Sequence, residues 1–100
     1  MSILAVEMEI PNVEGGIITE DTLKVDLSDG RTISVPLAWY PRLVHASGKE
    51  LYNWRLIGQG QGIHWEDLDE DISVAGLLTG KPSGESQSSF NKWLKSRAKH

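Results

Sequence analysis

The chain has 100 residues and contains no cysteine. This absence excludes a disulfide framework, a thiolate zinc site and a thiol nucleophile. No apolar run approaches the roughly 18 residues that a membrane-spanning helix needs. The first residues, MSILAVEMEIPNVEGG, have no basic segment and carry glutamates within the apolar stretch, so no signal peptide is expected. We therefore expect a single cytoplasmic domain.

Basic side chains are scarce over most of the chain. Residues 1–80 hold 13 acidic and 5 basic side chains, whereas residues 81–100 hold 5 basic and 1 acidic. Phosphate contacts dominate nucleic-acid binding, so residues 1–80 should repel nucleic acid and only residues 81–100 could attract it. We expect the partner to be another protein or a second copy of the chain.

The motifs of several cofactor sites are incomplete. Gly58, Gly60 and Gly62 do not have the spacing of a dinucleotide fingerprint, and the sequence has no Gly-Lys-Ser/Thr of a P-loop. These glycines are expected to serve a turn or a bulge. His64 and Glu66 form the first part of a zinc-deaminase motif, which also requires cysteines. We therefore expect no cofactor and assign no catalytic residue.

Five carboxylates lie between Glu66 and Asp71. Asp67, Asp69 and Asp71 match positions one, three and five of a calcium loop, but Ile72 stands at position six, which requires glycine. We assign no metal ligand and expect the run to precede or enter a helix, where it would complement the helix dipole. The alternatives are an acidic surface for a partner and a looser metal site.

Alternating apolar residues predict strands. Residues 3–10 show the pattern, with Leu4, Val6, Met8 and Ile10 on one side. Pro11–Thr19, which contains two adjacent glycines, is expected to be a turn or loop.

Residues 23–37 predict a β-hairpin. The length of its loop follows from the requirement that apolar residues of the two strands pair with each other. A two-residue loop at Asp29-Gly30 would place each apolar residue opposite a polar one. A three-residue loop, Ser28-Asp29-Gly30, pairs Val25 with Ile33 and Leu23 with Val35. We therefore expect a three-residue loop with Gly30 in a left-handed conformation.

Proline and capping residues predict the helices. Pro41 should lie in the first turn of one helix, and Ser47 with Glu50 fits a capping box for a second. Ser73 should cap a short helix that ends before Gly80. NWRLIG and GIHW are expected to be paired strands. Together these elements predict an α+β fold: a small antiparallel sheet of four to five strands, two or three short helices, and an appended C-terminal helix.

Residues 81–89 have the composition of a linker. Residues 90–100 place Phe90, Trp93 and Leu94 on one face of a basic amphipathic helix. A helix this short is marginal alone in water, so these side chains require cover. Their own domain, a partner protein, nucleic acid and an anionic membrane all remain open.

The run LSDGRTISVPLAWYPRL, followed by NWRLIGQGQGIHWEDLDEDISVAGLLTG, resembles the bacterial family catalogued as domain of unknown function 2442. The resemblance covers residues 1–80 and is most specific over Gly60–Val74. It implies a small α+β domain, alone or ahead of a helix-turn-helix domain, and a gene often paired with another in a toxin–antitoxin-like arrangement. It implies no catalytic residue. The chain departs from the pattern after residue 80, where the tail is too short for a helix-turn-helix domain.

Three functions follow from these patterns. The first is a non-catalytic protein-interaction or regulatory module, one half of a gene pair. Its candidate contact residues are Trp39, Tyr40, His64, Asp67, Asp69, Asp71, Phe90, Trp93 and Leu94. The second is a metal-dependent hydrolase or nuclease using Glu66–Asp71 with His64. The third is nucleic-acid binding through residues 81–100.

Overall fold

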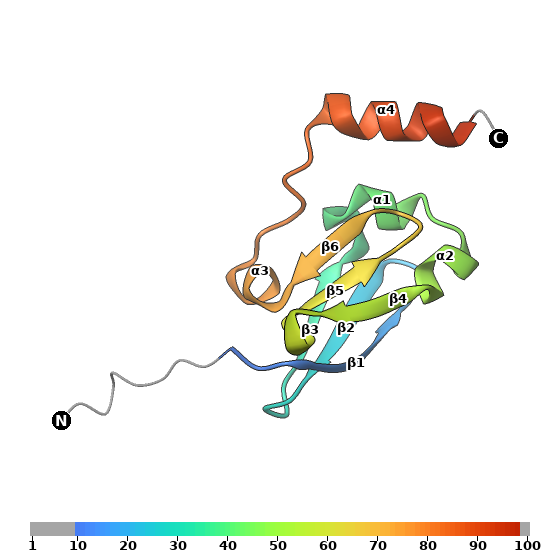
Figure 1. The fold of residues 1–100 in the computed structure, drawn as a ribbon. Coiled ribbons are helices and arrows are strands. Elements are labelled where there is room, and N and C mark those ends of the chain that lie inside the picture. Colours follow the sequence, from blue (N-terminus) through green and yellow to red (C-terminus); the bar gives the residue numbers. More distant parts are fainter. Residues whose placement is uncertain (1–9, 99–100) are drawn as a thin grey trace.

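The computed structural model describes residues 10–98, which form an α+β fold with two three-stranded antiparallel sheets (Figure 1). The first sheet has the order β1-β2-β3 and the second β4-β5-β6. The strands are β1 (Val13–Ile18), β2 (Thr22–Leu27), β3 (Thr32–Pro36), β4 (Trp54–Ile57), β5 (Gly62–Trp65) and β6 (Glu70–Ser73). The helices are η2 (Leu37–Trp39), α1 (Pro41–Val44), α2 (Gly48–Tyr52), η3 (Gly58–Gly60), α3 (Val74–Thr79) and α4 (Gln87–Ala98).

The β2–β3 hairpin has the register that pairs apolar residues with apolar residues. Val25 pairs with Ile33 and Leu23 with Val35, so the apolar residues of both strands share a face. Gly30 closes the loop with φ +94°, a conformation that costs glycine little and other residues more. The predicted three-residue loop is confirmed.

The prediction of a single sheet of four to five strands is wrong, because the structure has two sheets of three strands each. Two of these strands, β1 and β6, were not predicted. Residues 11–19 were expected to be a loop, but Val13–Ile18 forms β1 and pairs with β2. The register shifts between Val13 and Gly15, so a bulge at Glu14 breaks the alternation from which a strand is recognised. Residues 3–9 of the strand predicted over 3–10 lie outside the described residues.

The second missed strand is β6, formed by the end of the acidic run. Glu70 pairs with Trp65 and Asp71 with His64. Asp69 has φ +51° in the turn that joins β5 to β6. The acidic residues were expected at a helix start, but α3 begins at Val74 and has no acidic residue in its first turn. They therefore build a hairpin and do not complement the helix dipole.

The predicted helix caps are confirmed. Pro41 is the first residue of α1, where its missing N–H costs nothing. Ser47 accepts from the backbone N–H of Glu50, and Glu50 accepts in return from that of Ser47. Ser73 caps α3, and Gly80 ends it in a left-handed conformation. The loop after β4 likewise uses left-handed backbone at Gly58 and Gly60, so these glycines serve turn geometry.

One core joins the inner faces of the two sheets. It is built from β2, β3, β5, β6 and α3, with further contributions from β1, η2, α1 and the β5–β6 turn. Its largest fully buried side chain is Trp65, which is 1% exposed and donates from Nε1 to the Leu51 carbonyl oxygen at 3.1 Å. The shared core, with Trp65 in it, therefore holds the two sheets together.

The helix α4 begins at Gln87, three residues before the predicted start, and lies above α1 in Figure 1. Trp93 packs against the core. Arg97 donates to both carboxylate oxygens of Glu50, at 2.9 and 2.7 Å. The aromatic face of the tail is therefore covered by its own domain. Within residues 10–98, every helix is too short or too polar to cross a membrane.

Candidate functional site

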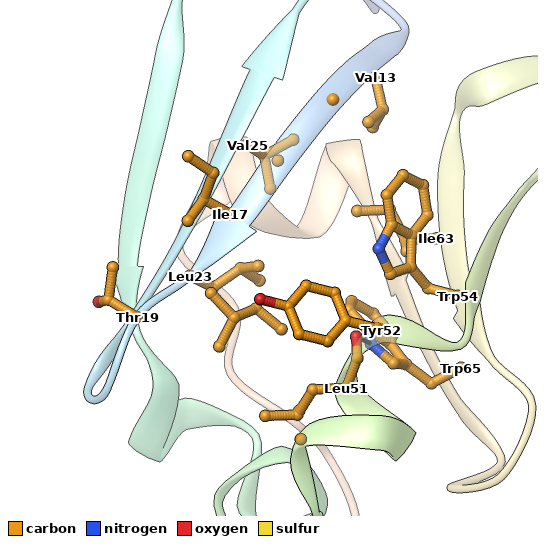
Figure 2. Close-up of a pocket in the computed structure, with 14 residues that line it drawn as sticks. Val13, Ile17, Thr19, Leu23, Val25, Leu51, Tyr52, Trp54, Ile63 and Trp65 are labelled. Carbon is orange, nitrogen blue, oxygen red and sulfur yellow. Dashed lines mark hydrogen bonds between the residues drawn. The ribbon is translucent and has the colours of Figure 1, made fainter.

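A hollow lies between β1 and β4, each of which is an edge strand of its sheet. We call it the β1–β4 pocket. Its volume is about 500 Å³, and Figure 2 shows Ile17, Leu23 and Val25 on one side and Trp54 and Trp65 on the other. The lining is predominantly apolar and comprises Val13, Gly15, Gly16, Ile17, Ile18, Thr19, Leu23, Val25, Gly48, Leu51, Tyr52, Trp54, Ile63 and Trp65.

The pocket exists because the core side of β4 is incompletely covered. Trp54 pairs with Trp65, and Leu56 pairs with Ile63, so both β4 residues lie on the face that carries the core. Trp65 and Ile63 are buried, yet Trp54 is 37% exposed and Leu56 41% exposed. The first sheet covers β5 but leaves the apolar face of β4 open to solvent.

Two further apolar side chains are exposed beside it. Tyr52, at the end of α2, is 83% exposed, and Ile17 of β1 is 62% exposed. Both line the pocket. A contiguous group of exposed apolar side chains marks a binding surface more often than scattered ones do.

Gly16 is part of the pocket lining at a point where β1 and β2 approach closely. It pairs with Val25, whose side chain is fully buried, so position 16 lies on the inner face of β1. A Cβ atom there would lie 2.8 Å from the Lys24 carbonyl oxygen. The close approach of the β2 backbone therefore excludes a side chain at this position.

The carboxylates of the acidic run are divided between two places. Asp67 accepts a hydrogen bond from Asn53 Nδ2 at 2.9 Å, whereas Asp71 pairs with His64 Nδ1. Asp69, in the β5–β6 turn, lines a shallow depression together with Glu70 and Asp71. Arg42 and Glu85 form another part of its lining. Residues 10–98 contain no group of three or more histidine and acidic side chains that could hold a metal ion.

His64 points away from the core, as the alternation of β5 predicted. It belongs to a row of polar side chains across the outer face of the second sheet, where Arg55 of β4 and Asp71 of β6 lie opposite it. His64 Nε2 also lies 3.6 Å from Glu66 Oε1. This row is a cross-strand charge network, which stabilises a sheet by neighbouring pairs.

Arg42 joins the tail to the body. Its guanidinium donates to both carboxylate oxygens of Glu85, at 2.9 and 2.5 Å, and to the Leu68 carbonyl oxygen at 2.7 Å. It also lies 5.0 Å from the ring centroid of Trp93, and Arg97 lies 4.6 Å from the same ring. Cations over an indole face are attracted to it, so Trp93 is held between two guanidinium groups.

Glu70 is the carboxylate with the most perturbed titration near this cluster. Burial raises the pKa of Glu70 to about 7, and the negative charge of Glu85 adds to the rise while Arg42 opposes it. By contrast, the hydrogen bond from Arg42 holds the pKa of Glu85 below its usual range. The arginine therefore neutralises Glu85 and leaves Glu70 to accept a proton near neutral pH.

Glu70 should make stability fall as the pH rises from about 4.5, its ordinary value, to about 7. In that window the folded state binds more protons than the unfolded state, so the free energy of unfolding decreases. The substitution Glu70→Gln should remove this fall and stabilise the protein at pH 8 by about 1–3 kcal/mol. Urea unfolding between pH 4.5 and 8 measures it. Glu14→Gln, at an exposed position, is the control, and identical profiles for the two variants would contradict the assignment.

The remaining candidate residues have structural positions. Tyr40 is 4% exposed within the core, and Trp39 is half-buried, with its carbonyl oxygen accepting from the Ser83 N–H at 2.9 Å. Phe90 stacks on Trp93 and makes a tilted contact with His45, and Leu94 is half-buried. None of these residues lines the β1–β4 pocket.

Sequence reasoning missed the residues that do line it. The sequence showed Trp54 and Leu56 on one side of a strand but gave no sign of what covers them. Tyr52, Trp54 and Leu56 stand at every second position. This spacing could have predicted an apolar face longer than the strand itself. The two glycines of β1 were interpreted as a loop, which hid the other wall of the pocket.

Comparisons with known proteins place the chain in a family. Residues 17–83 match the family described as "Protein of unknown function (DUF2442)". The chain belongs to this family, and the resemblance seen in the sequence is confirmed. No curated protein matches the chain.

Two solved structures are similar to this one. The first is a crystal structure of a protein of unknown function from Rhodospirillum rubrum ATCC 11170, with a TM-score of 0.64 and 30% sequence identity. The match covers 80% of this chain and 96% of that one. The second is a solution NMR structure of an uncharacterized protein from Chromobacterium violaceum, with a TM-score of 0.62 and 20% identity, covering 81% of this chain and 74% of that one. The second likeness concerns the fold alone.

Proposed function

We propose that this chain is a non-catalytic protein-binding module whose β1–β4 pocket receives an extended apolar segment of a partner protein. The observation that carries the proposal is that the exposed side chains of Tyr52 and Trp54 line an apolar pocket between two sheet edges. An edge strand presents backbone N–H and C=O groups with which an added strand can pair. Apolar pockets beside it then select the side chains of that strand.

The lining of the pocket favours binding over chemistry. Within residues 10–98, the lining contains no carboxylate, imidazole, ammonium or guanidinium group, and its polar side chains are those of Thr19, Tyr52 and the two indoles. A hydrolytic site needs a positioned acid, base or metal. A partner strand needs apolar contact, and the exposed tyrosine and tryptophan are the residue types that dominate binding energy at protein interfaces.

The resemblance to gene-paired regulatory proteins suggests where such a partner would come from. We propose the product of a neighbouring gene in the same cytoplasm, with the chain as the regulatory half of the pair. A small apolar molecule would also fit a pocket of about 500 Å³. The experiment below separates a peptide from that occupant.

The test is to select ten-residue peptides from a random displayed library on the full chain. We expect enriched peptides with apolar residues at alternate positions. Tyr52→Ser should weaken their binding tenfold or more, because a tyrosine contact of this kind is worth about 2 kcal/mol. Tyr52 is 83% exposed, so its replacement should leave the fold intact.

The matched control is Arg55→Ser on the opposite face of β4. Arg55 pairs with His64 on the outer face, away from the pocket, and its side chain is 62% exposed. Affinity for the selected peptides should be unchanged in this variant. Selection of no peptide, or peptides that bind the Tyr52 variant as well as the original, would refute the proposal and direct the search to small apolar molecules.

A further inference from the structure

Helix α4 is attached to the rest of the domain by ion pairs near its two ends. Before its first residue, Glu85 accepts from Arg42 of α1, and near its last residue Arg97 donates to Glu50 of α2. Figure 1 shows α4 above α1, joined to α3 by an extended linker. The apolar side chains described in α4 are half-buried, Trp93 included. Detachment of α4 would therefore leave the fully buried core covered, as in a local opening.

Glu70 lies beside the first of these ion pairs, on the core side of β6. It pairs with the buried Trp65, so its side chain leaves the strand on the inner face of the sheet. There it lines the same depression as Arg42. Residues 83–85, which lead into α4, also line this depression. The segment that carries α4 therefore covers part of the surroundings of Glu70.

The groups that face Glu70 favour its protonated form while α4 is docked. Burial and the negative charge of Glu85 outweigh the attraction of Arg42, and the pKa of Glu70 rises to about 7. All three guanidinium nitrogens of Arg42 are directed to Glu85 and to the Leu68 carbonyl oxygen. Further titratable groups near Glu70 are those of Asp69 and Asp71 on the same hairpin and of Tyr40 before α1.

We propose that α4 is a latch, a segment that docks on α1 and α2 and is released when Glu70 loses its proton. The ionised carboxylate repels Glu85, competes with it for Arg42, and requires hydration that residues 83–85 hinder. Each of these effects favours release. Release uncovers the aromatic face of α4 together with the surface of α1 beneath it. The latch residues Arg42, Glu70 and Glu85 lie outside the lining of the β1–β4 pocket, so the inference is independent of the proposed function.

Linkage sets the direction of the effect. The pKa of Glu70 is about 7 in the docked state and falls toward its ordinary value of 4.5 when release hydrates the carboxylate. Between these values the docked state binds more protons, so docking weakens as the pH rises. One proton is linked, which limits the rise in the ratio of released to docked molecules to about tenfold per pH unit.

The other charged groups of the latch keep their charge in this window. Arg97 holds the pKa of Glu50 at about 2, and Arg42 holds the pKa of Glu85 below its usual range. Both carboxylates therefore stay ionised from pH 5 upward. The ion pair between Arg97 and Glu50 acts as an attachment that does not respond to pH there.

Distances between two spin labels test the latch in the full chain. The chain has no cysteine, so Lys95→Cys on α4 and Ser34→Cys on β3, both at exposed positions, introduce the label sites without background. The docked helix should give one narrow distance distribution, and the released helix a separate broad one. We expect the ratio of released to docked molecules to rise at least tenfold between pH 5 and pH 7.5.

Three variants of the labelled chain assign the effect. Glu70→Gln should keep α4 docked at both pH values, because the amide stays neutral. Glu66→Gln is the matched control, at a glutamate whose side chain is 62% exposed, and should retain the rise. Arg97→Ala removes the second attachment, so it should increase the released population at both pH values and leave the pH dependence intact.

Two results would overturn the latch directly: equal released populations at pH 5 and pH 7.5, or the same rise in Glu70→Gln as in the unchanged chain. His45 contacts Phe90 of α4, so His45→Gln is measured as well. A rise that is lost in this variant and kept in Glu70→Gln would assign the effect to the histidine and refute the proposal. The indole N–H resonance of Trp65 should be unchanged at pH 7.5, and its loss in parallel with release would mean global unfolding in place of a latch.

Discussion

Replacing Trp65 with alanine is expected to lower the free energy of unfolding by about 3–5 kcal/mol. The indole is 1% exposed and is the largest fully buried side chain, so its removal leaves a cavity where the two sheets meet. It also removes the hydrogen bond that the Trp65 indole donates to the Leu51 carbonyl oxygen. Urea unfolding followed by circular dichroism measures the loss independently of tryptophan fluorescence.

The matched control is Trp54→Ala, which removes the same side chain from the paired position on β4. Trp54 is 37% exposed, so we expect a loss of only about 1–2 kcal/mol. The two substitutions therefore compare an indole in the core with one at the pocket. Equal losses would mean that the face of β4 is covered as fully as that of β5, contrary to the structure.

The second large effect is expected from Arg42→Ala, with a loss of about 3–5 kcal/mol. The guanidinium and the Glu85 carboxylate are both largely buried, so removal of the cation leaves an unpaired charge close to Glu70. The substitution also removes the donor to the Leu68 carbonyl and one cation from the face of Trp93. Chemical unfolding gives the loss, and hydrogen exchange in α4 shows whether the tail detaches.

A double-mutant cycle isolates the ion pair. Arg42→Ala with Glu85→Ala should cost less than the sum of the two single losses, because neither charge is then left alone. Arg31→Ala breaks an exposed pair with Asp29 and should change the free energy of unfolding little, because solvent screens the pair. Additive losses at Arg42 and Glu85 would show that the pair does not couple the tail to the body.

The sequence predicted those parts of the fold that follow from local chemistry. The β2–β3 register followed from the alternation of apolar residues, since only a three-residue loop places the apolar faces of both strands on the same side. The starts of α1, α2 and α3 followed from Pro41, Ser47 and Ser73, whose side chains determine where a helix can begin.

The sequence failed where a strand depends on its neighbour. In β1 a bulge and two adjacent glycines remove the alternation, and only pairing with β2 defines the strand. In β6 the acidic residues suggested a helix start, although Ile72 pairs with Ile63 in the core. Both errors concern contacts between residues distant in sequence, which a local pattern does not contain.

The sequence prediction of an interaction surface stays a prediction, and the pocket described above is lined by other residues than those that the sequence suggested. Trp39 and Tyr40 were suggested as contact residues, yet the exposed aromatic side chains are those of Tyr52 and Trp54. Tyr40 is buried and Trp93 is enclosed by Arg42 and Arg97. Exposure depends on which sheet covers which strand, and that is decided by packing between elements.

The position of β4 at a sheet edge also bears on aggregation. The other described edges carry features that discourage pairing between molecules: the bulge in β1, Pro36 at the end of β3, and the acidic residues of β6. β4 has a single charged side chain, Arg55, and an exposed apolar face. At high concentration, self-association of the folded protein should therefore start at β4, and any strand that covers this edge also acts to keep the protein dispersed.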